Sequence, residues 1–204
     1  MTPRRMTFLS ILCSSLLLGA ALALMTATSF ATTLDVGGVK IEDSIAIYNN
    51  TLLLNGAGIM PGGKTPLYVA HIYAKAKFTT LDALVGTSGP KRLTLTAIRE
   101  VDTGPILKML SRSVEATAAK GDMAKLIPGM MNIGNVFKAN RVLKPGEVMS
   151  LDWVPITGLV IYIGGKMQGD PIRDPVLFRA AMGVWMGEAP ADAKLKDALL
   201  GHLE

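Results

Sequence analysis

The stretch Leu67-Tyr68-Val69-Ala70-His71-Ile72-Tyr73 decides the class of fold. Its residues alternate in type over seven positions, and a period of two places odd-numbered side chains on one face of a β-strand and even-numbered ones on the other. Residues 91–100 repeat the alternation. We therefore expect two neighbouring strands of one sheet.

Shorter strand patterns lie on both sides of this pair. Residues 34–41 are interrupted by Gly37-Gly38 and predict a hairpin, and residues 51–55 predict a strand that ends at the turn signal Asn55-Gly56. Near the other end of the chain, residues 147–154, 159–163 and 166–169 alternate with Gly- and Pro-containing turns. These three segments predict an antiparallel meander.

The spacing of apolar residues becomes helical after Thr103, which we expect to cap a helix at its N-terminus. A second helix is expected between residues 121 and 140. Asp174 followed by Pro175 predicts the start of a helix that runs to about residue 186, and Asp192 predicts the start of another. The order of strands and helices indicates an α+β fold, with a large antiparallel sheet covered by helices on one face.

Composition excludes several classes of protein. The chain has 204 residues, of which 50% are hydrophobic and 18% charged, with a mean hydropathy of +0.37. This balance supports a packed core and argues against disorder. The formal net charge is only +5 and aromatic residues make up 5%, so a nucleic-acid partner is not expected.

The first 31 residues have the pattern of a secretory signal peptide. Arg4 and Arg5 precede an apolar run over residues 8–24, and small residues lead to a cleavage position after Ala31. The alternative is an uncleaved membrane anchor. We expect a signal peptide over 1–31, a single domain over 32–204, a periplasmic or secreted location and no membrane span after cleavage. Cys13, the only cysteine, lies in this leader, so the mature domain has neither a disulfide nor a thiolate.

Three other patterns suggest chemistry only weakly. Residues 58–65 match the phosphate-binding string G-x-x-x-x-G-K-S/T, but a strand pattern follows where that motif requires a helix. His71 and His202 are the only histidines and have no metal-ligand spacing. The chain has 12 methionines, which suit a core filler or the wall of an apolar cavity better than a Cu(I) site. No cofactor and no metal ion are expected.

Several segments in order resemble the chalcone isomerase-like family. They are residues 54–59 (LNGAGI), 68–73 (YVAHIY), 162–166 (YIGGK), 185–188 (WMGE) and 195–201 (LKDALLG). The resemblance covers about residues 39–201. It implies an open-faced β-sandwich, in which helices pack on one face of a large antiparallel sheet.

The resemblance also implies where the catalytic groups of the named enzymes would fall. The cleft arginine that steadies the oxyanion corresponds to Met60, and the threonine on the next strand corresponds to Tyr68. The helix tyrosine falls near Leu107, and a later polar residue falls at Val184. Because Met, Leu and Val offer no hydrogen-bond donor to an oxyanion, we expect chalcone isomerisation to be absent and assign no catalytic residue.

What the resemblance leaves is a binding cavity. Members of the superfamily without isomerase activity resemble fatty-acid binders, where an arginine and a tyrosine hold the carboxylate. Tyr68 matches that tyrosine, Met60 removes the arginine, and Lys64 or Arg99 could replace it. We therefore expect an exported protein that binds an apolar small molecule such as a fatty acid. The alternatives are an intramolecular lyase or isomerase, and an envelope interaction protein without a ligand, and the oligomeric state is left open.

Overall fold

The computed structural model describes residues 32–119 and 121–202, so the leader predicted over residues 1–31 lies outside the described part. Seven strands form one antiparallel sheet in the order β11-β10-β9-β6-β5-β4-β3. Their bounds are β3 Ser44–Ile47, β4 Asn50–Met60, β5 Tyr68–Ala74, β6 Lys91–Ala97, β9 Val148–Val154, β10 Gly158–Ile163 and β11 Lys166–Ile172.

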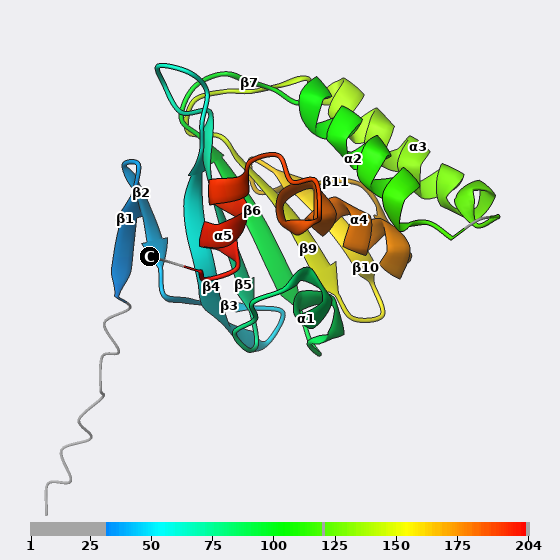
Figure 1. Ribbon diagram of the computed structural model, residues 1–204, viewed down its shortest axis with the longest axis horizontal. Coiled ribbons are helices and arrows are strands. Elements are labelled where there is room, and N and C mark those ends of the chain that lie inside the picture. The colour runs from blue at the N-terminus through cyan, green and yellow to red at the C-terminus, as the bar shows by residue number, and fades with distance from the viewer. Residues whose placement is uncertain (1–31, 120, 203–204) are drawn as a thin grey trace, which may run out of the picture. The chain divides into compact units, whose positions relative to one another are not determined.

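Two small strand pairs and five helices complete the described part. The pairs are β1 (Thr33–Val36) with β2 (Val39–Glu42), and β7 (Val101–Asp102) with β8 (Val142–Leu143). The helices are α1 (Leu81–Gly86), α2 (Gly104–Thr117), α3 (Met123–Ala139), α4 (Pro175–Met186) and α5 (Ala193–Leu199). Figure 1 shows α2, α3 and α4 together on one side of the sheet, with α5 beside β4 and β5.

The two faces of the sheet can be followed from β5, in which every residue is buried. Tyr68, Ala70 and Ile72 join the main core, which includes buried residues of all five helices; we call this the helix face. Val69 and Tyr73 belong to a second cluster with residues of β1 and β2; we call this the hairpin face. The predicted α+β architecture is therefore confirmed, and the hairpin adds partial cover on the opposite face.

The helix starts predicted at Asp174 and Asp192 are confirmed. The Asp174 carboxylate accepts hydrogen bonds from the backbone N–H groups of residues 176 and 177, at 2.8 and 3.1 Å, and Asp192 accepts one from Leu195 at 2.8 Å. Thr103 is also the N-cap residue of α2, as predicted, but its side chain makes no capping hydrogen bond to that helix. Helix α2 begins at the next residue, but the Thr103 hydroxyl donates to the carbonyl of Asn140 at 3.0 Å, and so joins the start of α2 to the end of α3.

The turn predicted at Asn55-Gly56 is also wrong, because β4 continues through it with a bulge. The Asn55 side-chain amide donates to the carbonyls of Phe78 and Leu199, at 2.9 and 2.8 Å. A Cβ at Gly56 would collide with the Ala198 carbonyl oxygen of α5. Asn55 and Gly56 therefore allow close packing and do not reverse the chain. The extra residue of the bulge turns Met60 toward the helix face.

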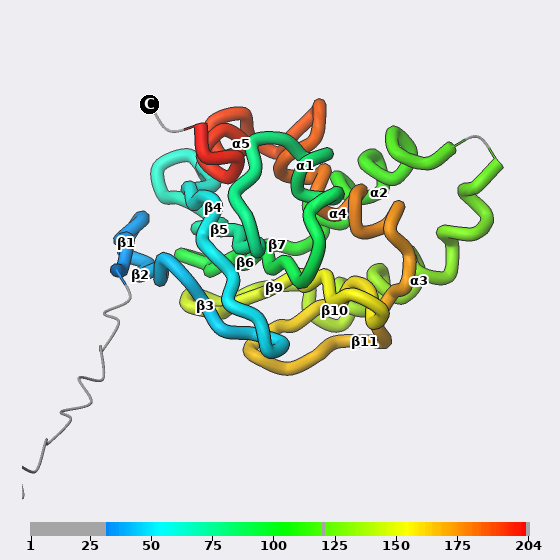
Figure 2. Tube along the Cα trace, turned by 90° about the horizontal axis from the view of Figure 1, so that it is seen from below, coloured from blue at the N-terminus to red at the C-terminus, as the bar shows by residue number. Residues whose placement is uncertain are grey.

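The sheet also curls strongly. The β3–β4 hairpin lies beside β9 and β10, although β5 and β6 separate β4 from β9 in the sheet (Figure 2). A direct contact shows how close the two regions come, because the Tyr48 hydroxyl at the hairpin tip donates to the Asp152 carboxylate of β9 at 2.6 Å. The curl leaves a hollow on the part of the hairpin face that β1 and β2 do not cover.

Candidate functional site

Met60 and Tyr68 lie directly opposite each other on β4 and β5, as the last pair before the connecting loop. Tyr68 is only 2% exposed, and its hydroxyl oxygen accepts a hydrogen bond from Trp185 Nε1 of α4 at 2.9 Å. Burial raises the pKa of Tyr68 to about 12. The residue is therefore a neutral phenol at physiological pH and not a ready base.

Trp185 and Val184 line a small cavity between the sheet and the helices. Its walls are apolar and are formed by Ile106, Leu110, Ile133, Phe137, Leu151, Leu159, Ile161, Ala181, Val184 and Trp185. Its volume is about 10 Å³, which is room for a single water molecule. In this state, side chains fill the space between the layers.

Of the candidate binding residues singled out from the sequence, only Val184 lines this cavity. Leu107 is half-buried and borders a separate surface pocket beside Thr103 and Phe137. Lys64 is exposed in the β4–β5 loop, and the exposed Arg99 donates to the carbonyl of Gly62 in that loop at 3.0 Å. The structure thus brings Met60, Tyr68 and the Val184–Trp185 segment together, and places Leu107, Lys64 and Arg99 elsewhere.

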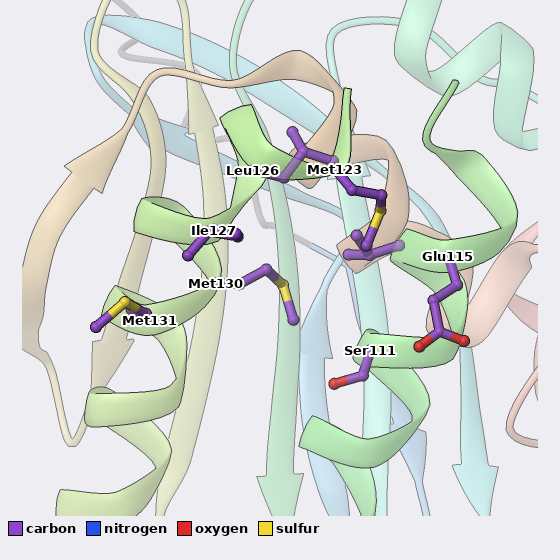
Figure 3. A pocket seen from close by; sticks show the side chains of 8 residues that line it. Ser111, Glu115, Met123, Leu126, Ile127, Met130 and Met131 are labelled. Carbon is purple, nitrogen blue, oxygen red and sulfur yellow. The ribbon is translucent and has the colours of Figure 1, made fainter. Parts of the chain in front are cut away.

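A larger apolar groove of about 360 Å³ lies between α2 and α3, where the two helices approach their connecting turn. It is lined by Ser111, Val114, Glu115, Met123, Leu126, Ile127, Met130 and Met131. In Figure 3, Met123 and Met130 extend from α3 into the space that faces Ser111 and Glu115 of α2. The abundance of methionine indicated an apolar wall of this kind, but the sequence did not locate it.

The groove and the small cavity follow one another along the same two helices. On α2, residues 106 and 110 line the cavity and residue 114 lines the groove; on α3, residues 133 and 137 line the cavity and residues 126 and 130 line the groove. Side chains at spacings of three and four share one face of a helix. The groove is therefore the wide, exposed end of one apolar seam, and the cavity is its narrow, buried end.

The described residues contain little else that suggests chemistry on the helix face. Within residues 32–119 and 121–202, no group of three or more His, Cys, Asp or Glu side chains is placed to hold a metal ion. In the same ranges, no helix combines the length and the apolar character that crossing a membrane requires. The seam can bury the hydrocarbon part of a ligand, and its exposed end carries one hydroxyl and one carboxylate.

Comparison with known proteins supports the fold reached from the sequence and the structure. A fatty-acid binding protein of Arabidopsis thaliana has a similar solved structure, with a TM-score of 0.60 and 15% sequence identity over 84% of this chain and 97% of that one. At this identity the likeness shows a shared fold. No curated protein matches the sequence.

The sequence itself provides the family. The family model described as chalcone isomerase-like matches residues 33–201, which includes every strand and helix of the described part. Together with the helix-covered antiparallel sheet, this match shows that the chain belongs to the chalcone isomerase-like family.

Proposed function

We propose that this protein binds an apolar small molecule, such as a fatty acid or a related acyl compound, in the seam between α2 and α3, and does not catalyse isomerisation. The observation that carries the proposal is the groove of about 360 Å³ between these helices, because pockets for small ligands start near 300 Å³ and have mainly apolar walls. The fatty-acid binding protein that shares the fold supports the same class of ligand.

An acyl chain would need more room than the buried end of the seam provides. The cavity of about 10 Å³ has to widen, and α3 is the element best suited to move. Pro128 lies inside this helix and lacks the backbone N–H of an ordinary turn, and Gly129 and Gly134 also weaken it. We propose that α3 bends away from α2 as the chain enters, and that the unbranched methionine side chains repack around it.

The polar end of the ligand would lie at the exposed end of the seam. Ser111 and Glu115 are the polar side chains there, and the residues that line the groove include no cation. A carboxylate beside Glu115 is disfavoured by repulsion between like charges, whereas an alcohol can donate to the Glu115 carboxylate and accept from the Ser111 hydroxyl. We therefore propose that an uncharged long-chain compound, such as a fatty alcohol, binds more tightly than the corresponding carboxylate.

We also propose that binding takes place after export, in the periplasm or outside the cell. This rests on the signal-peptide pattern of residues 1–31. Expression of the full-length gene followed by N-terminal sequencing of the exported protein tests it. A mature N-terminus near Thr32 is expected, and retention of the intact leader on a membrane-bound protein would contradict it.

Displacement of Nile red, a neutral apolar dye, tests ligand binding. Purified protein comprising residues 32–204 is expected to bind the dye saturably, and 1-dodecanol is expected to displace it at lower concentration than dodecanoate at pH 8. Met130→Gln, in the groove, should raise the half-displacing concentration of dodecanol about tenfold, because it places an amide on an apolar wall. Met167→Gln is the matched control, since Met167 is 54% exposed on β11.

Two results would count against the proposal. One is the absence of saturable dye binding by a folded protein. The other is equal displacement curves for Met130→Gln and Met167→Gln, which would place the ligand outside the seam. Organic extraction of the purified protein followed by mass spectrometry gives an independent answer, because a resident ligand should appear in the extract.

A further inference from the structure

A pocket on the hairpin face lies on the opposite side of the sheet from the α2–α3 seam. Its volume is about 520 Å³, and it is lined by Ile47, Tyr48, Arg92, Thr94, Val148, Ser150, Tyr162 and Gly165. These residues belong to β3, β6, β9, β10 and two hairpin turns. The hollow therefore lies where the curl of the sheet, which Figure 2 shows, brings the β3–β4 hairpin close to β9 and β10.

Tyr48 closes one side of this hollow. Its hydroxyl donates to Asp152 Oδ2 at 2.6 Å and lies 3.2 Å from the Tyr162 hydroxyl. Tyr48 and Asn49 have positive φ angles of 50° and 56°, the pair of left-handed residues that a tight two-residue hairpin turn requires. Burial and the neighbouring Asp152 raise the pKa of Tyr48, so it remains a donor. The hairpin tip is thus fixed across the sheet to β9.

The charges in the hollow are balanced by the protein itself. Arg92 binds Asp152 through two hydrogen bonds, from Nε to Oδ1 at 2.7 Å and from Nη2 to Oδ2 at 2.5 Å, and the Asp152 side chain is fully buried. With the Tyr48 hydroxyl as a third donor, the Asp152 carboxylate accepts three hydrogen bonds from protein side chains. A charged ligand would have to be desolvated beside a neutral ion pair, which disfavours ions and favours uncharged molecules.

A row of hydrogen-bonding side chains crosses four strands of the sheet, and its last three members line the hollow. His71 of β5 lies opposite Thr94 of β6, Thr94 lies opposite Ser150 of β9, and Ser150 lies opposite Tyr162 of β10. The last three present hydroxyl groups to the pocket, and each hydroxyl can both donate and accept. Directly opposite residues share one face of a sheet, so the row is continuous.

The first member of the row has an unused polar atom. His71 is 9% exposed, and its Nδ1 is the one buried side-chain nitrogen or oxygen without a hydrogen-bond partner in residues 32–119 and 121–202. Buried polar groups in proteins are almost always paired, with protein or with other molecules. His71 is not among the residues that line the pocket; it adjoins the site through its neighbour Thr94.

We propose that the hollow on the hairpin face binds a neutral ring-shaped molecule with several hydroxyl groups. Such a molecule exchanges hydrogen bonds with Thr94, Ser150 and Tyr162, requires no counter-charge, and can place its less polar side against Ile47 and Val148. The shared chemistry fits both a sugar-like alicyclic polyol and a polyhydroxylated aromatic ring. This site is independent of the seam, because the sheet separates the two.

Titrations followed by NMR test the proposal with two probes. The protein comprising residues 32–204, labelled with ¹⁵N, is titrated with myo-inositol, an alicyclic polyol, and with phloroglucinol, an aromatic one. At least one probe is expected to cause saturable shifts of backbone amides in β6, β9 and β10. Shifts with inositol alone identify sugar-like ligands, and shifts with phloroglucinol alone identify phenolic ligands.

Variants locate the site. Thr94→Val keeps the shape and removes one hydroxyl from the row, and it should weaken the binding probe at least threefold; Ser150→Ala gives the same test if the first variant does not fold. Ser111→Ala removes a hydroxyl from the seam on the other face and should leave the affinity unchanged. The absence of saturable shifts with both probes, or equal affinity in Thr94→Val, Ser150→Ala and the unaltered protein, would overturn the proposal, whatever the outcome for Nile red.

Discussion

The two faces of the sheet differ in how tightly their side chains pack. On the helix face, large apolar side chains from strands and helices interlock, and only about 10 Å³ remains between them. On the hairpin face, the backbone curls, the lining side chains are both polar and apolar, and about 520 Å³ stays open. One strand shows the contrast well, because Leu151 of β9 lines the first space and its neighbours Ser150 and Asp152 belong to the second.

This contrast teaches that helix cover and available space are separate properties of the fold. Covering a sheet with helices buries apolar surface and stabilises the domain, but close packing then leaves little room between the sheet and the helices. A curled sheet leaves room for a ligand without helices, provided that side-chain contacts hold the far edge of the sheet in place. Here Tyr48 and the Arg92–Asp152 pair supply that fixation. Three substitutions and one change of pH test this difference between the two faces.

The largest effect is expected from Asp152→Ala on the hairpin face. It leaves Arg92, whose side chain is 25% exposed, without its anion and removes the acceptor of Tyr48. Breaking a buried pair in this way should lower the free energy of unfolding by about 4 kcal/mol in urea denaturation. Asp82→Ala, which breaks the exposed pair with Arg179, is the matched control and should cost less than about 1 kcal/mol. Equal losses would mean that the hairpin tip is not held by this network.

A somewhat smaller loss is expected from Leu151→Ala on the helix face. Leu151 is 5% exposed and lines the buried end of the seam, so the substitution should cost about 3 kcal/mol of unfolding free energy. It should also enlarge the cavity and tighten the binding of dodecanol. Leu53→Ala is the control, since Leu53 is 42% exposed. Tighter binding without loss of stability would show that the cavity is already open in solution.

The hairpin face should also make the protein sensitive to acid. Burial, with a smaller effect of Arg92, lowers the pKa of His71 from 6.5 to about 4 in the folded state. Between these values the unfolded chain binds a proton that the folded one does not, so stability falls as pH decreases. The loss from pH 7 to pH 5 should be on the order of 2 kcal/mol.

Urea denaturation at the two pH values measures this effect in the unaltered protein and in two variants. His71→Gln should reduce the difference between pH 7 and pH 5, whereas His202→Gln should leave it unchanged, because His202 is exposed. If His71→Gln retains the full difference, other groups cause the acid sensitivity.

The smallest effect is expected from Tyr68→Phe on the helix face. It removes the acceptor of the Trp185 indole N–H, and an unpaired buried donor should cost about 1.5 kcal/mol. Tyr73→Phe on the hairpin face removes a bond to the carbonyl of Glu42, a residue that water can reach, and should cost less. The difference can be measured by thermal denaturation of both variants, and a larger loss in Tyr73→Phe would contradict the picture of a drier helix face.

Much of the fold could be predicted from the sequence, because its signals are local. The alternation over residues 67–73 and the caps at Asp174 and Asp192 depend on spacings of a few residues, and the structure confirms them. Asn55-Gly56 has the composition of a turn, but its partners Phe78 and Leu199 are far away in the sequence. Local chemistry alone therefore could not distinguish a turn from a bulge at that position.

The candidate sites were less accessible to sequence reasoning. The resemblance placed Met60 and Tyr68 on neighbouring strands, and they are direct partners in the sheet. The α2–α3 groove had a compositional signal in the methionines but no positional one. The hollow on the hairpin face had no local signal, because it depends on the curl of the sheet and on a contact between Tyr48 and Asp152 across 104 positions of the chain.

The hydrogen bonding of Asn55 has a consequence for the speed of folding. Its hydrogen bond to Leu199 joins residues 144 positions apart, and α5 packs on β4 where Gly56 leaves room for it. A contact of such separation requires the closure of a very long loop, which slows the formation of the native state. We expect refolding in the range of milliseconds to seconds, with the docking of α5 as a late step.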